Sequence, residues 1–151
     1  MKGIDDRRVG ERLIHTATED LMGDDADLIT QPKFRIWLRR DGIVQLVWNP
    51  RTTVFLEDAT AALQAMAQLT RGRRSPLLVD MHDTGPLDRP TRAELTRRSD
   101  LQAAVALIVG TPLTRMMANF FLSVNRPAFP TRMFDDEASA VAWLLEFVGP
   151  Q

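Results

Sequence analysis

A histidine lies next to aspartates in the stretch Asp80-Met81-His82-Asp83. Side chains alternate along an extended strand, so Asp80 and His82 point to the same side and could form an acid–base pair. A metal ion would need further ligands, and the other histidine, His15, lies near the N-terminus. The simpler interpretation is a capping aspartate and a loop histidine that hydrogen-bond to the neighbouring backbone. We therefore predict no catalytic residue, no metal site, no cofactor and no enzyme activity.

A second candidate for chemistry is the stretch GTPLTR (110–115), where a predicted strand passes into a predicted helix. Free N–H groups at a helix N-terminus, together with the Arg115 guanidinium, can hold an anion. The more common alternative is that Thr111 simply caps the helix. Ligands of open α/β sheets gather at the carboxyl ends of parallel strands, where this loop and the 83–91 loop should lie. The residues of this candidate binding site are Thr84, Asp88, Arg89, Thr91, Thr111, Thr114 and Arg115.

Apolar residues recur at helical spacing just after this loop. The members of the stripe are Leu113, Met116, Met117, Phe120, Phe121 and Val124. Core packing is the favoured explanation, and a lipid pocket is the alternative, because methionine and phenylalanine make adaptable apolar surfaces. The basic run 71–74 is typical of a solvated turn and less often of a docking patch.

The elements that must position these residues alternate in type along the chain. Strands predicted at 34–40 and 43–49 flank Asp41-Gly42, a strong signal for a two-residue hairpin turn. The other predicted elements are a helix over 55–69, a strand over 75–81, a helix from Pro90 capped by Asp88, a strand over 103–110, a helix over 111–125, a strand over 131–136 and a helix over 137–148. This order predicts an α/β fold with a mixed sheet, an N-terminal β-hairpin, later strands parallel and about four helices.

Composition narrows the class of protein. The chain has no cysteine, which excludes disulfides and thiolate chemistry. Residues 1–30 hold eight acidic and four basic residues without sustained periodicity, which predicts an acidic mobile arm ahead of a domain over 31–151. Residues 31–151 hold twelve acidic and fifteen basic residues, and this small positive excess gives weak electrostatics for binding a phosphate backbone. We therefore expect no nucleic acid to bind. The absence of a long apolar run predicts no signal peptide, no membrane span and a cytoplasmic location.

The element order resembles that of the STAS domain, the anti-sigma-factor-antagonist fold. The residues that carry the resemblance are Val79-Asp80 at the end of a central strand and Leu87-Asp88 eight residues later, and it spans 33–148. The later half is more similar to SpoIIAA-like, or STAS/SEC14-like, proteins through the run AVALIVGTPLTRMMANFFLSVNRPAFPTRMF and the Trp-Leu helix that follows it. That branch is one of uncharacterised function, and the fold itself hosts unrelated tasks.

The resemblance also exposes a departure. In switched members of that family, a serine after the loop aspartate receives a phosphate that adds nearly two negative charges. Here Arg89 and Pro90 stand at those positions, and neither can be phosphorylated. Thr91 comes one residue too late and Thr84 lies earlier in the loop, so an ordinary phosphoswitch is not expected.

Two functions follow from these observations. The resemblance implies a non-enzymatic regulatory or protein-interaction module, homodimeric and bound to a protein partner, that lacks the usual phospho-acceptor serine. The alternative is a carrier or sensor of a small apolar or anionic ligand that uses the loops 83–91 and 110–115. A structure with an enclosed apolar cavity would favour this second function.

Overall fold

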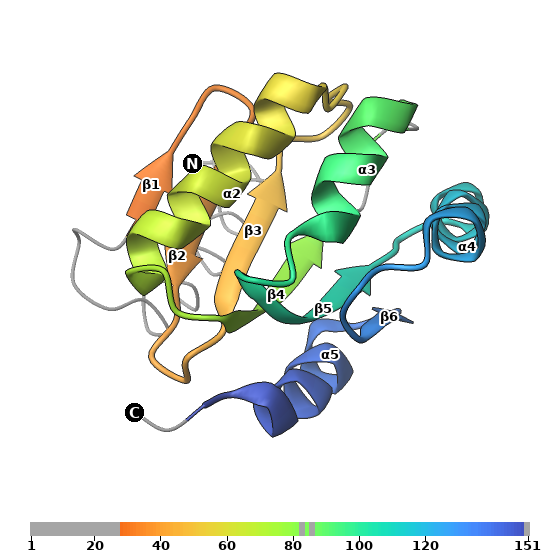
Figure 1. The fold of residues 1–151 in the computed structure, drawn as a ribbon. Helices are drawn as coiled ribbons and strands as arrows, with labels where there is room; N and C mark the ends of the chain where they lie inside the picture. Colours follow the sequence, from red (N-terminus) through yellow and green to blue (C-terminus); the bar gives the residue numbers. More distant parts are fainter. Residues whose placement is uncertain (1–27, 82–83, 85–86, 150–151) are drawn as a thin grey trace, which may run out of the picture.

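A mixed sheet of six strands, in the order β1-β2-β3-β4-β5-β6, organises the chain (Figure 1). The computed structural model describes residues 28–81, 84 and 87–149, so His15, His82 and Asp83 lie outside the described residues. The strands are β1 (Leu28–Thr30), β2 (Phe34–Leu38), β3 (Val44–Trp48), β4 (Ser75–Asp80), β5 (Gln102–Ile108) and β6 (Thr131–Phe134). The helices are α2 (Leu56–Thr70), α3 (Arg89–Arg97), α4 (Pro112–Asn125) and α5 (Glu137–Leu144), followed by a short 3₁₀ helix, η2 (Leu145–Phe147).

The pairing of the strands confirms the predicted fold class. The strands β1, β2 and β3 pair antiparallel, whereas β3, β4, β5 and β6 pair parallel. A helix connects each parallel strand to the next, as the alternation of elements along the chain predicts.

The hairpin between β2 and β3 lies where Asp41-Gly42 predicts it, but its loop has three residues. The Arg39 N–H donates to the Ile43 carbonyl at 2.8 Å, and the Gly42 N–H donates to the Arg39 carbonyl at 3.0 Å. Gly42 has a φ of 91°, a left-handed conformation that glycine adopts without steric cost. A turn followed by a glycine of positive φ is the usual geometry of a three-residue hairpin loop, so the predicted two-residue turn is corrected by one residue.

The first strand corrects the predicted boundary of the acidic arm. Leu28 pairs with Trp37 and Thr30 pairs with Arg35, so residues 28–30 form the edge of the sheet. Three residues are too few for an alternating pattern to stand out, and polar residues flank them on both sides. The domain therefore begins at Leu28 at the latest, and residues 1–27 lie outside the described residues.

Alternating side chains give the sheet two different apolar faces. One face packs against α5, and small residues such as Ala104 and Ala106 let this helix approach closely. The buried residues of this layer are Ile43, Leu78, Ala104, Ala106, Ile108, Ala140 and Leu144. The opposite face carries the larger core and faces α2 and α3 (Figure 1). Phe34, Ile36 and Leu46 point into this larger core, as their alternation predicts.

The apolar stripe of α4 overturns the expectation of core packing. Leu113, Met116, Phe120 and Val124 are each more than half exposed, whereas the small side chain of Ala118 is buried. In Figure 1, α4 stands at the side of the sheet beyond α3, and it contacts chiefly α3 and β6. Spacing along the sequence shows that one helix face is apolar, but it does not show whether another element covers that face.

The difference between the two kinds of apolar residue predicts two different mutational costs. Leu78→Ala leaves a cavity beneath α5, where Leu78 is 0% exposed, and we expect it to lower the free energy of unfolding by about 2–5 kcal/mol. Phe120→Ala removes a side chain already 59% in solvent, and we expect a loss below about 1 kcal/mol. Urea unfolding of both variants checks this. Equal losses would mean that α4 packs into the core.

Candidate functional site

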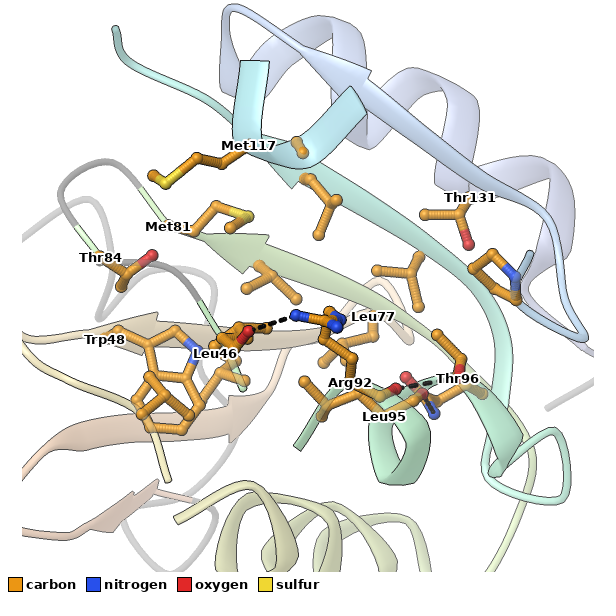
Figure 2. A pocket seen from close by; sticks show the side chains of 18 of the residues that line it. Leu46, Trp48, Leu77, Met81, Thr84, Arg92, Leu95, Thr96, Met117 and Thr131 are labelled. Carbon is orange, nitrogen blue, oxygen red and sulfur yellow. Dashed lines mark hydrogen bonds between the residues drawn. The ribbon is translucent and has the colours of Figure 1, made fainter. Parts of the chain in front are cut away.

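An apolar pocket of about 390 Å³ lies between the larger sheet face, α3 and α4 (Figure 2). Small-molecule sites in proteins usually fall between about 300 and 1,000 Å³, so the pocket is large enough for one small ligand. Its floor consists of strand residues that point away from α5, namely Leu46, Leu77, Val79, Val105 and Leu107. Leu95 of α3 and Met117 of α4 belong to its walls.

The pocket exists because α3 and α4 together leave part of the sheet face uncovered. Leu77 and Val79 alternate with Leu78, so β4 supplies both the floor of the pocket and the layer under α5. Met116 and Phe120 line the pocket and are also more than half exposed. The pocket is therefore open to solvent beside α4 rather than enclosed.

Polar groups in the lining are mostly satisfied by the protein itself. The Thr96 hydroxyl donates to the Arg92 carbonyl at 2.9 Å, and the Gln102 amide donates to the Leu95 carbonyl at 3.1 Å. Arg92 is the one charged side chain among the described lining residues. Its Nη1 donates to the Leu87 carbonyl at 2.6 Å, as the dashed line in Figure 2 marks, while its Nε is buried without a partner among the described residues.

The predicted site residues of the first loop have mixed places. Thr84 is buried and lines the pocket, as Figure 2 shows. Asp88 caps α3 by accepting from the Thr91 N–H at 3.0 Å and from the Thr91 hydroxyl. Thr91 is fully buried, and Arg89 is exposed at the start of the helix. A role of Asp88, Arg89 or Thr91 in binding stays a prediction.

The second loop has the capping geometry that the sequence analysis gives as the more common alternative. The Thr111 hydroxyl accepts from the Thr114 N–H at 3.0 Å, and the hydroxyls of Thr111 and Thr114 lie 2.8 Å apart. Arg115 forms an ion pair with Asp135, just after β6, instead of extending toward the 83–91 loop. Of the seven predicted site residues, Thr84 alone is part of the described pocket lining.

Sequence reasoning missed Arg92 and the strand residues of the pocket floor. Arg92, Leu95 and Thr96 lie three and four positions apart, so they share one face of α3. That face turns toward the sheet, and an arginine on it is a signal that the sequence offers. The sequence does not predict the pocket itself, because the pocket depends on the distance between α4 and the sheet.

The described residues hold no group of three or more histidines, cysteines and acidic residues that could bind a metal ion. Asp80 is half-buried at the end of β4, and the other members of the predicted acid–base pair and metal site, His82, Asp83 and His15, lie outside the described residues. Within the same part of the chain, no helix is long and apolar enough to cross a membrane.

The cap of α3 predicts a pH dependence of stability. Hydrogen bonds from the Thr91 hydroxyl and N–H, with a smaller contribution from the charge of Arg92, lower the pKa of Asp88 below its ordinary value of 3.8. A lowered carboxyl pKa adds stability that is present above pH 3.8 and is lost as the pH falls through the folded-state pKa. Asp88→Asn keeps a capping oxygen without the charge, so we expect it to melt earlier than wild type at neutral pH.

That difference in melting temperature should shrink as the pH falls below 3.8. Thermal melts of both proteins across the acid range measure it. Thr91→Val removes the hydroxyl donor, and in that background Asp88→Asn should lower the melting temperature by less at neutral pH. A constant difference at every pH would show that the charge of Asp88 has no part in the cap.

Comparisons with known proteins show a family and name no activity. The model of the family described as "Domain of unknown function (DUF7793)" matches residues 36–148. An uncharacterised DUF3478-family protein with a SpoIIAA-like fold from Shewanella loihica PV-4 is 14% identical, with a TM-score of 0.49, over 77% of this chain and 98% of its own. A protein with unknown function from Arthrobacter sp. FB24 is 36% identical, with a TM-score of 0.29, over 72% of this chain and 96% of its own.

No curated protein matches the sequence significantly. The STAS resemblance stays a prediction at the level of the superfamily. The family match spans most of the domain, from the middle of β2 to the residue after η2. On that match, the chain belongs to the DUF7793 family.

Proposed function

We propose that the protein is a non-enzymatic binding domain that holds a small apolar molecule in the pocket between the sheet, α3 and α4. The observation that carries this proposal is the hollow of about 390 Å³ over the middle of the larger sheet face. Small-molecule sites in proteins are usually clefts of this size with a mainly apolar lining. The open pocket leaves apolar side chains of the sheet facing water, and an apolar ligand would remove that surface from water.

The chemistry of the lining supports binding by burial. Its floor is made of leucine and valine. The flexible side chains of Met81, just after β4, and Met117 of α4 can adjust to ligands of different shape. Each methylene group that leaves water contributes about 0.8 kcal/mol. The sequence predicts a protein-interaction module first and a ligand carrier second. The pocket is open beside α4 rather than enclosed, but its size and apolar lining support the carrier as the first proposal.

The proposal predicts a regular gain in affinity with ligand length. Titration calorimetry with alkan-1-ols from hexanol to decanol should give affinities that rise about fourfold per methylene until the pocket is full. Leu107→Trp places a large ring on the floor of the pocket and should abolish binding. Leu145→Trp is the matched control, because Leu145 is exposed in η2 and does not line the pocket.

Melting curves of both tryptophan variants verify that they fold. Equal binding by wild type and a folded Leu107→Trp variant would place the alcohols elsewhere. No binding of any alcohol to wild type would contradict the proposal.

The exposed stripe of α4 favours a second candidate function, contact with a protein, and we propose a second copy of this chain as the partner. The exposed members of the stripe are Leu113, Met116, Phe120 and Val124, which lie on one helix face over about 16 Å. Arg115, the single charged residue of α4, lies on the opposite side of the helix and pairs with Asp135. Two such stripes can therefore meet without like charges between them.

The dimer proposal has its own test, because Leu113 and Val124 do not line the pocket. Leu113→Glu combined with Val124→Glu places carboxylates in the contact, and we expect the dimer to dissociate at least about tenfold more readily. Sedimentation over a range of concentrations measures this, with Leu145→Glu as the control for an added surface charge. A wild-type protein that sediments as a monomer throughout, or a variant that dimerises equally well, would contradict it.

A further inference from the structure

We infer that the ligand carries an oxyanion on its apolar body and that Arg92 binds this head inside the pocket. The inference rests on the proposed function and adds to it the chemical class of the ligand. It also differs from the anion site expected at residues 110–115, because Thr111 and Arg115 are engaged with Thr114 and Asp135.

Arg92 lies where it can reach a ligand inside the pocket. The residue lies four positions after the cap of α3 and lines the pocket together with Leu87 and Leu95. Figure 2 shows its guanidinium among the side chains of the pocket, with one hydrogen bond to the Leu87 carbonyl. That bond fixes one nitrogen of the guanidinium at the pocket wall and so orients the planar group.

Arg92 forms no ion pair with a carboxylate of the described residues, although its charge acts on nearby Asp88 at the start of α3. The ion pairs on α3 join Glu94 to Arg97 and to Arg98, and neither involves Arg92. Asp88 uses one carboxylate oxygen, Oδ1, for both hydrogen bonds from Thr91. The Arg92 Nε is buried without a hydrogen-bond partner among the described residues.

The Nε–H is part of the charged guanidinium of Arg92, and leaving it buried without a partner costs free energy. An anion that accepts a hydrogen bond from it recovers that free energy. The guanidinium presents its N–H groups in a planar fork, which matches two oxygens of a carboxylate or a phosphate. A cationic head is repelled there, and a hydroxyl head meets fewer of the donors. The apolar floor then takes the rest of the molecule.

The experiment compares four probes that share a decyl chain and differ in the head. Decanoate and decyl phosphate carry an oxyanion, decan-1-ol is neutral and decyltrimethylammonium is cationic. Titration of the full chain at neutral pH should give an affinity for decanoate or decyl phosphate about tenfold or more above that for decan-1-ol. The better of the two anions identifies the head, and decyltrimethylammonium should bind most weakly.

Variants of Arg92 separate this inference from the proposed function. Arg92→Met keeps an unbranched chain without charge, and we expect it to lose the preference, so that decanoate binds no better than decan-1-ol. Arg92→Lys keeps the charge without the fork and should restore part of the preference. Arg97→Met is the control, because its side chain is largely exposed on the same helix and does not line the pocket.

Three results would overturn the inference or its basis. Equal affinities of wild type for decanoate and decan-1-ol would contradict the inference of an anionic head, while the proposed binding of an apolar ligand would still hold. A preference for decanoate that persists in folded Arg92→Met, with Arg92→Lys unchanged as well, would place the head elsewhere. Failure of all four probes to bind would overturn the proposed function together with the inference.

Discussion

The structure depends on the need to cover both apolar faces of one sheet. Side chains of the central parallel strands alternate, so Leu78 and Ala106 face α5 while Val79 and Leu107 face the opposite layer. Helix α5 covers its face closely over alanines. On the other face, α2 and α3 leave part of the sheet uncovered. Helix α4 lies beside this uncovered part without filling it, and the pocket lies there. The proposed ligand completes a layer that the chain itself leaves open.

The place of α4 follows from interactions at its start. Thr111 caps the helix, and Arg115 in its first turn pairs with Asp135 after β6. The ion pair joins α4 to the end of β6 at the edge of the sheet rather than to its middle. One side of the apolar stripe therefore borders the pocket, and the other side remains in solvent. The two proposed functions therefore use neighbouring parts of one apolar surface. Substitutions at residues that belong to only one part, such as Leu107 in the pocket or Val124 on the stripe, distinguish ligand binding from dimer formation.

Much of the fold follows from local patterns in the sequence. Alternation predicts the hairpin strands, apolar runs predict β4 and β5, and capping residues predict the starts of α3 and α4. Local patterns do not predict the strand β1, because it has three residues and forms through pairing with β2. Local patterns do not predict the pocket for a similar reason. The spacing of Met116 and Phe120 is the same whether their helix face packs against a core or faces solvent. The same limit holds for polar residues, because a capping threonine and a ligand-binding threonine look alike in sequence, and Arg92 shows its place only once α3 lies against the sheet.

A ligand on the sheet face beside α4 lies next to methionine side chains, and their methyl groups report on it directly. Met81 and Met117 line the pocket, whereas Met66 is a buried residue of α2 and does not line it. With methyl-labelled methionine and saturating decan-1-ol, we predict intermolecular nuclear Overhauser effects from the alkyl chain to the methyls of Met81 and Met117 and none to Met66. Contacts to Met66, or binding without contacts to either pocket methionine, would contradict the account.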